Sequence, residues 1–351
     1  MKKLDVIDLI LSYGSPTQKY VVSRDILSVD KNSADMLLLQ EQILDSKEVR
    51  RILRSQNADG WFGIYLHGGA GGNLKSGAMD GSIARFRELG LEMHYDFIRK
   101  AKAALYADEY PTKAKRSYPP VNEYNFSRAE TLANMHIDGE EPDELLVKFQ
   151  NLLLDKFRRG SKVESLDEVS RVIKSAKFAN SFPESRAYLP GKDFPWPSDF
   201  IVLGSSLNWK TAAAANVITD AMENVARLEP IPAIFDVVRG HYVGPICGYS
   251  DLDLYGDCCD IPKGYIVFWL RAYNFLCKIC DVSQIPHYFR QAERLAERIS
   301  DDSLIDNLSA EALKAIESTY GFAGEWKTET QKQVDVYYKA LQILHNARID
   351  F

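Results

Sequence analysis

Apolar residues recur along most of the chain at the spacing of helices. Met36, Leu39 and Ile43 are separated by three and then four residues after Ser33, a spacing that places them on one face of a helix. With Ser33 as N-cap, this pattern predicts a helix from Ser33 to about Ser55. The same spacing predicts further helices over residues 80–90, 97–105, 127–136, 142–157, 165–178, 209–228, 264–280, 285–299, 308–320 and 328–347.

The N-terminal segment also has a helical pattern. Asp5 and Asp8 interrupt its apolar residues, so we interpret it as an amphipathic first helix and not as a signal peptide. Alternating strand patterns are almost absent from the chain. About a dozen helices joined by short turns therefore predict an all-α fold.

Two stretches interrupt the helical pattern. Residues 57–81 contain eight glycines, and residues 181–197 contain four prolines. Each stretch is typical either of a connection between helices or of an ordered loop at the rim of a pocket. The aromatic residues in both stretches favour ordered loops, because a flexible linker seldom exposes such side chains. We therefore expect a single domain over residues 1–351, with an irregular seam at residues 181–197.

Composition narrows the setting and the partners. The 351 residues include 43 Lys and Arg against 49 Asp and Glu, a net charge of −6, and 46% are hydrophobic. This balance is typical of a globular protein and argues against a nucleic-acid partner, which would require a basic surface. Apolar runs are too short to span a membrane. Five clustered cysteines, an odd number, indicate reduced thiols and predict a cytoplasmic protein.

Residues 53–63 read Leu-Arg-Ser-Gln-Asn-Ala-Asp-Gly-Trp-Phe-Gly. Asp59 and Gly60 predict a tight turn with positive φ at Gly60. The segment resembles the Gln-Asn-x-Asp-Gly-x-x-Gly turn between helices of terpenoid cyclases and protein prenyltransferase β subunits. Residues 321–326, followed by 335–344, resemble a second copy of this unit. The resemblance implies an α/α toroid of about a dozen helices.

The resemblance also implies an activity. Members of this superfamily act on isoprenoid or similar hydrophobic small molecules in an aromatic-lined cavity, and some use zinc or magnesium. Four carboxylates within residues 251–260 form the densest acidic cluster of the chain. The residues that we assign to this chemistry are Asp251, Asp253, Asp257 and His67 for catalysis, Trp61, Tyr255, Trp269 and Trp326 for substrate binding, and Asp257 and Cys259 for a metal ion.

Three alternatives accompany this hypothesis. The acidic motif ends in Leu254, and Tyr338 stands where a prenyltransferase has histidine, which favours a helical toroid that serves as a non-catalytic scaffold or binding protein. The acidic cluster is equally typical of a solvated loop. His67-Gly68-Gly69 resembles the oxyanion loop of α/β-hydrolases, which makes a serine hydrolase with Ser206 as nucleophile a less favoured hypothesis.

The pair Cys277 and Cys280 has two interpretations. Together with Cys258 and Cys259, the two residues could supply thiolates to zinc. They lie one turn apart in an apolar helix, however, and thiols in such surroundings behave most often as small buried apolar groups. We therefore predict that Cys277 and Cys280 are core residues.

Overall fold

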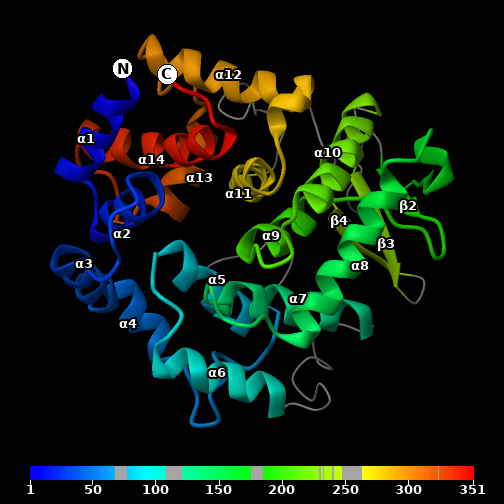
Figure 1. Ribbon diagram of the computed structural model, residues 1–351, viewed down its shortest axis with the longest axis horizontal. Coiled ribbons are helices and arrows are strands. Elements are labelled where there is room, and N and C mark those ends of the chain that lie inside the picture. Colours follow the sequence, from blue (N-terminus) through cyan, green and yellow to red (C-terminus); the bar gives the residue numbers. More distant parts are fainter. Residues whose placement is uncertain are drawn as a thin grey trace. The chain divides into compact units, whose positions relative to one another are not determined.

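The chain is mostly helical (Figure 1). A computed structural model describes residues 1–67, 77–107, 121–174, 185–228, 231, 233–238, 241–246, 263–322 and 324–351. Within these ranges it contains the α-helices α1 (Lys3–Tyr13), α2 (Pro16–Val21), α3 (Ala34–Leu44), α4 (Lys47–Leu53), α5 (Met79–Glu88), α6 (Asp96–Ala107), α7 (Val121–Met135), α8 (Glu144–Gly160), α9 (Pro197–Ser205), α10 (Ala212–Arg227), α11 (Lys263–Ile279), α12 (Pro286–Ser300), α13 (Ala310–Tyr320) and α14 (Glu329–Ala347), with a short π-helix η1 (Val22–Ile26) after α2.

The chain divides into two compact units. Unit 1 consists of Met1–Leu146 and Ile316–Gln342, and unit 2 consists of Val147–Ala315 and Ile343–Phe351. The boundaries fall within α8, α13 and α14, and the proline-rich stretch 181–197 belongs to unit 2. The single domain predicted from the sequence stays a prediction.

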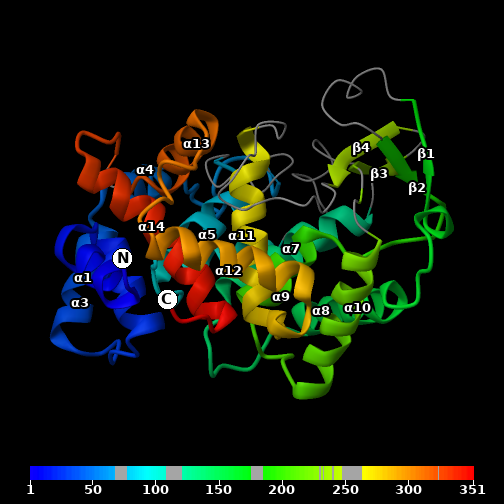
Figure 2. The same cartoon turned by 90° about the horizontal axis from the view of Figure 1, so that it is seen from above.

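Unit 1 is built from helices that bury apolar side chains against one another. α2 packs on α1, η1 and α3, and α5 packs on α7. Tyr20, Ile43 and Phe86 are buried on these helices, and burial of a large apolar side chain contributes about 2 kcal/mol to stability. Figure 2 shows the N-terminus beside α1.

Unit 2 combines helices with a small sheet. Its strands β1 (Ser170–Val172), β2 (Ser185–Tyr188), β3 (Ala233–Val238) and β4 (His241–Ile246) are ordered β1-β2-β3-β4, with only the β2–β3 pair parallel. α9 packs closely on α11. At this contact a Cβ on residue 204 would lie only 2.2 Å from Cδ1 of Phe275. Glycine at this position lets the two helices approach.

The structure corrects four of our sequence predictions. The long helix predicted over residues 165–178 is not formed in the described residues 165–174: Ser165 and Glu168 close a capping box around one short 3₁₀ turn, and β1 follows. The predicted helix over residues 33–55 is two helices, because Ser46 caps α4 after α3 has ended. The prediction that strands are nearly absent missed the four-stranded sheet.

The fourth correction concerns the serine hydrolase hypothesis. A serine elbow requires a strand before the nucleophile, and residues 197–205 form α9 instead. The Ser206 side chain is buried and its hydroxyl contacts Oδ1 of Asn208. Ser206 therefore has neither the backbone setting nor the exposure of a hydrolase nucleophile.

The turn at residues 56–63 is confirmed. Gly60 has φ +92°, and its N–H donates to the carbonyl of Asn57 at 2.9 Å. Asn57 in turn donates its backbone N–H to the carbonyl of Trp61 at 2.7 Å, which closes a small loop after α4.

The mostly helical character of the chain is confirmed, whereas the toroidal arrangement stays a prediction.

Candidate functional site

Most of the predicted site lies outside the described residues. The acidic candidates, the metal-binding candidates and one aromatic candidate all lie there: Asp251, Asp253, Tyr255, Asp257 and Cys259. Trp269 belongs to α11, but its side chain is not described. The described part of the chain holds no group of three or more His, Cys, Asp or Glu side chains that could bind a metal ion. His67, Trp61 and Trp326 are the predicted site residues whose side chains are described.

His67 is paired with a carboxylate that we did not predict. Its Nδ1 contacts Oδ2 of Asp80 within hydrogen-bond distance, and the side chains are 27% and 10% exposed. When Nδ1 donates its hydrogen to Asp80, Nε2 becomes the basic nitrogen of the ring. This arrangement, a carboxylate that orients a histidine through Nδ1, is a common form of general acid–base pair.

The local backbone brings the two residues together. The backbone N–H of Asp80 donates to the carbonyl of Leu66 at 3.0 Å. Because Leu66 precedes His67, this bond brings Asp80 next to the histidine. Gly63 has φ +64°, and a Cβ there would lie 2.2 Å from the carbonyl oxygen of Gly77. Only glycine at position 63 permits the backbone there to lie this close to the backbone of Gly77.

Asp80 is itself held in place. It occupies the first turn of α5, where backbone N–H groups and the helix dipole favour a negative charge. Its Oδ1 accepts the backbone N–H of Gly81 at 2.6 Å. One carboxylate oxygen therefore faces the helix and the other faces His67, which fixes the orientation of the imidazole.

The two described tryptophans have clear local contacts. The Trp61 side chain is buried, and the backbone N–H of this residue donates to Oδ1 of Asp59 at 3.3 Å within the turn after α4. The indole Nε1 of Trp326 donates to Oδ2 of Asp335 at 2.6 Å. These contacts tie both tryptophans to the framework of unit 1, and their role in substrate binding stays a prediction.

Asp335 is a functional group that the sequence did not reveal. Its Oδ1 accepts the Nε2–H of Gln18 at 2.6 Å, so the carboxyl joins α2 to α14. Burial, the largest cause, and the charge of Glu317 together raise its pKa from 3.8 to about 6, although the hydrogen bonds from Trp326 and Gln18 lower it. Asp335 is therefore a buried carboxyl that changes its charge near neutral pH.

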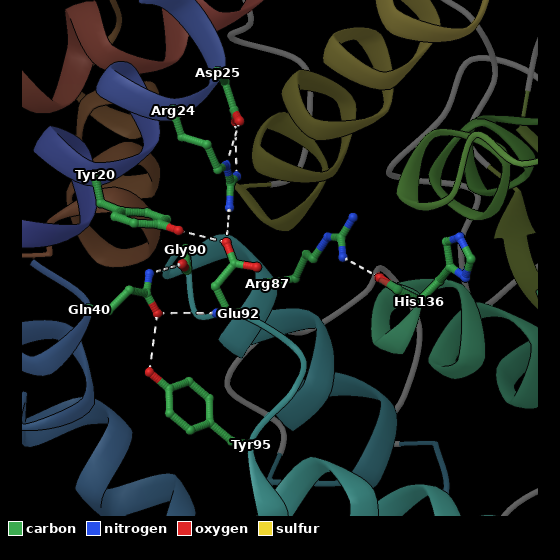
Figure 3. Close-up of polar contacts among 9 residues, drawn as sticks. All are labelled: Tyr20, Arg24, Asp25, Gln40, Arg87, Gly90, Glu92, Tyr95 and His136. Carbon is green, nitrogen blue, oxygen red and sulfur yellow. Dashed lines mark hydrogen bonds and ion pairs between the residues drawn. The ribbon is translucent and has the colours of Figure 1, made fainter. Parts of the chain in front are cut away.

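A second polar cluster of unit 1 joins η1 to the turn after α5 (Figure 3). The hydroxyl of Tyr20 donates to Oε1 of Glu92 at 2.6 Å, and Nη1 of Arg24 donates to the same oxygen at 3.2 Å. Burial opposes the charge of Glu92, but the Tyr20 hydrogen bond and the Arg24 charge together lower its pKa. Burial and the bond to Glu92 raise the pKa of Tyr20. Glu92 is thus a charged acceptor fixed from two sides.

The turn itself is held by a glutamine. The Nε2 of Gln40 donates to the carbonyl of Gly90 at 2.7 Å, and its Oε1 accepts the N–H of Glu92 at 3.2 Å (Figure 3). Gly90 has φ +79°, a conformation typical of a glycine that follows the end of a helix. This bracket positions Arg87, in the last turn of α5, relative to α3.

Arg87 reaches from α5 to the end of α7. Its Nη1 donates to the carbonyl of His136 at 2.8 Å (Figure 3), where a cation also suits the negative end of the helix dipole. Burial lowers the pKa of Arg87, and the charge of Arg24 lowers it further. Burial likewise lowers the pKa of the His136 ring. The charges of Arg87 and Lys102 lower this pKa as well, whereas those of Asp138 and Glu140 raise it.

Comparison with known protein families, with curated proteins and with solved structures finds no match to this chain. The interpretation of the site therefore depends on the geometry above and on the resemblance seen in the sequence. In the described ranges, helices of sufficient length and apolar character to cross a membrane do not occur.

Cys277 and Cys280 are confirmed as buried core residues. Both are free thiols, with 3% and 6% of their surface exposed. Burial raises the pKa of Cys280 to about 12 and that of Cys277 well above its ordinary value. Since the thiolate is the reactive form, these two cysteines are chemically inert in the folded chain.

Proposed function

We propose that this chain is an enzyme that transfers protons to or from a small hydrophobic substrate, with His67 and Asp80 as the acid–base pair. The contact between Nδ1 of His67 and Oδ2 of Asp80 carries the proposal. The isoprenoid class of the substrate follows from the resemblance of residues 53–63 to α/α toroid enzymes. The helical fold supports that resemblance at the level of fold class.

The proposed step uses the two faces of the imidazole. Nε2 of His67 removes a proton from a substrate carbon next to an electron-deficient centre. The C–H bond breaks, its electron pair forms a C=C bond, and an N–H bond forms at Nε2. Asp80 stabilises the imidazolium produced, and the partial burial of this carboxylate strengthens that interaction. A positioned general base of this type contributes about 10²–10⁴-fold to a rate.

The experiment incubates the purified protein with isoprenoid alcohols, diphosphates and hydrocarbons and analyses products by gas chromatography and mass spectrometry. We expect His67→Ala and Asp80→Asn to lower kcat by about 10²-fold or more. His94→Gln, at an exposed position of unit 1, is the matched control and should keep wild-type turnover. Wild-type turnover in His67→Ala would refute the assignment.

A non-catalytic scaffold is the second candidate function. The hydrogen bond of the Trp326 indole to Asp335 favours it, because this side chain then serves the framework and not a substrate. A scaffold would give no product from any isoprenoid in the assay above. Its His67 would also react with diethyl pyrocarbonate no faster than exposed His94, whereas the proposed general base should react measurably faster at pH 7.

A further inference from the structure

His67 and Asp80 stand at the end of a short ladder of backbone contacts. The carbonyl of Leu66 accepts the N–H of Asp80 at 3.0 Å, and the preceding carbonyl accepts the N–H of the residue before Asp80 at 3.1 Å. The ladder begins where a Cβ on Gly63 would lie 2.2 Å from the carbonyl oxygen of Gly77. The place of Gly63 therefore helps to determine where the ladder ends.

Gly63 is held through both of its backbone polar groups. The side-chain Nδ2 of Asn57 donates to the carbonyl of Gly63 at 2.8 Å, and the N–H of Gly63 donates to the carbonyl of Ser55 at 3.0 Å. His67 follows four residues later, and no helix or long strand lies between the two positions to absorb a shift. A displacement of Gly63 is therefore passed on to His67.

Asn57 is itself fixed by its backbone. Its N–H donates to the carbonyl of Trp61 at 2.7 Å, and its carbonyl accepts the N–H of Gly60 at 2.9 Å. The neighbouring Gln56 donates its Nε2 to the carbonyl of Phe97 on α6 at 2.8 Å. Asn57 thus presents its side-chain amide from a turn that is anchored to α6, which lowers the entropy cost of its hydrogen bond.

We propose that Asn57 is a positioning residue, whose side chain keeps Nδ1 of His67 aligned with Oδ2 of Asp80. It acts through the carbonyl of Gly63. The catalytic meaning of this role rests on the function proposed above, although the alignment itself needs no substrate. Alignment matters because the hydrogen bond at Nδ1 decides which ring nitrogen is basic, and because a small displacement of a catalytic group lowers a rate strongly.

A purely structural role is the competing explanation. In that case the Asn57 side chain only stabilises the turn after α4, and its loss lowers the free energy of unfolding without changing the pair of His67 and Asp80. Both explanations predict lower stability for an Asn57 variant. Only the positioning role predicts that the tautomer of His67 changes while the protein stays folded.

The experiment records ¹⁵N NMR spectra of the histidine rings of the full chain at about pH 9, where neutral rings predominate. The His67 signal is identified by its absence in His67→Gln. We expect the wild-type ring to carry its hydrogen at Nδ1, because Asp80 accepts it. In Asn57→Asp, which keeps the side-chain shape but lacks the donor, the ratio of the Nδ1–H form to the Nε2–H form should fall about fivefold.

Two further variants control this measurement. Asn57→Ala removes the donor without adding the charge of aspartate, so it should change the tautomer in the same direction, and it decides alone if Asn57→Asp does not fold. Asn307→Asp is the matched control, because Asn307 is also exposed and donates its Nδ2 to a backbone carbonyl, that of Ser303, at 2.9 Å. It should keep the wild-type His67 spectrum.

The turnover assay described above separates this proposal from the proposed function. The kcat of Asn57→Asp should fall about fivefold together with the tautomer ratio. A tautomer change in the variants without any product from the wild type would refute the acid–base function and still support the positioning role. A wild-type tautomer in the folded Asn57 variants would overturn the positioning role, whatever their kcat, as would a wild-type ring that carries its hydrogen at Nε2.

Discussion

At the scale of single residues, Asp335 makes stability depend on pH. Its pKa is raised from 3.8 to about 6 by burial, so the folded state binds this proton more tightly than the unfolded state. Its contribution to stability is complete below pH 3.8 and is lost as the pH rises through 6, a change of about 3 kcal/mol. Relative to Asp335→Asn, which cannot ionise, wild-type stability should fall by this amount between pH 3.5 and pH 7.

The measurement is urea unfolding of both proteins at several pH values. Glu317 is a nearby charge that acts on Asp335, so Glu317→Gln should lower the pH at which the loss occurs. Asp306→Asn, at an exposed position, is the control and should leave the pH profile unchanged. A constant difference between wild type and Asp335→Asn at all pH values would show that Asp335 titrates normally.

Only part of the candidate site could be predicted from the sequence. His67 was recognisable because it precedes a glycine-rich segment, and its partner Asp80 was recognisable only as the start of a helix. Their pairing depends on the close approach of Gly63 and Gly77, which no residue pattern encodes. The contact of Tyr20 and Arg24 with Glu92 joins residues about 70 positions apart, so it follows from tertiary packing alone.

At the scale of elements, the turn after α4 depends on Gly60. Its φ of +92° is unfavourable for other residues, and a Cβ would lie 2.5 Å from the carbonyl oxygen of Lys100 on α6. Gly139 has a φ of +95° with no atom within 4 Å of its Cβ position. Gly60→Ala should therefore destabilise the chain by about 2 kcal/mol more than Gly139→Ala, which has backbone strain alone.

Urea unfolding of the two variants measures this difference. The Gly139 variant is the matched control for φ, so any further loss at Gly60 reports the contact with α6. Equal losses would mean that α6 moves away from the turn at little cost.

The pattern of apolar residues predicted most helices, because a helix that buries one apolar face repeats its apolar residues at the helical period. Predictions failed where a short local signal outweighed periodicity. Ser46 accepts the N–H of Val49 at 3.3 Å and starts α4 inside one apolar pattern. The strand β1 has only three residues and pairs with β2, whose first residue lies 15 positions away from Ser170. A strand this short has no period to detect.

At the scale of the whole molecule, unfolding of the two units should be coupled. The unit boundaries fall within α8, α13 and α14, so loss of unit 1 removes turns from helices that continue into unit 2. Helix formation is cooperative along a continuous helix. Gly60→Ala, a change in unit 1, should therefore lower the urea concentration at which unit 2 unfolds by the same amount as for unit 1.

Cys277 and Cys280 report on unit 2, because their buried thiols react only after it opens. The measurement is pulse alkylation at increasing urea, with mass spectrometry to read these two cysteines and hydrogen exchange of α5 peptides to read unit 1. In wild type and Gly60→Ala we expect the two midpoints to coincide, and to shift together between the proteins. A shift of the α5 midpoint alone would mean that the units fold independently, and the chain would then consist of two domains joined through three helices.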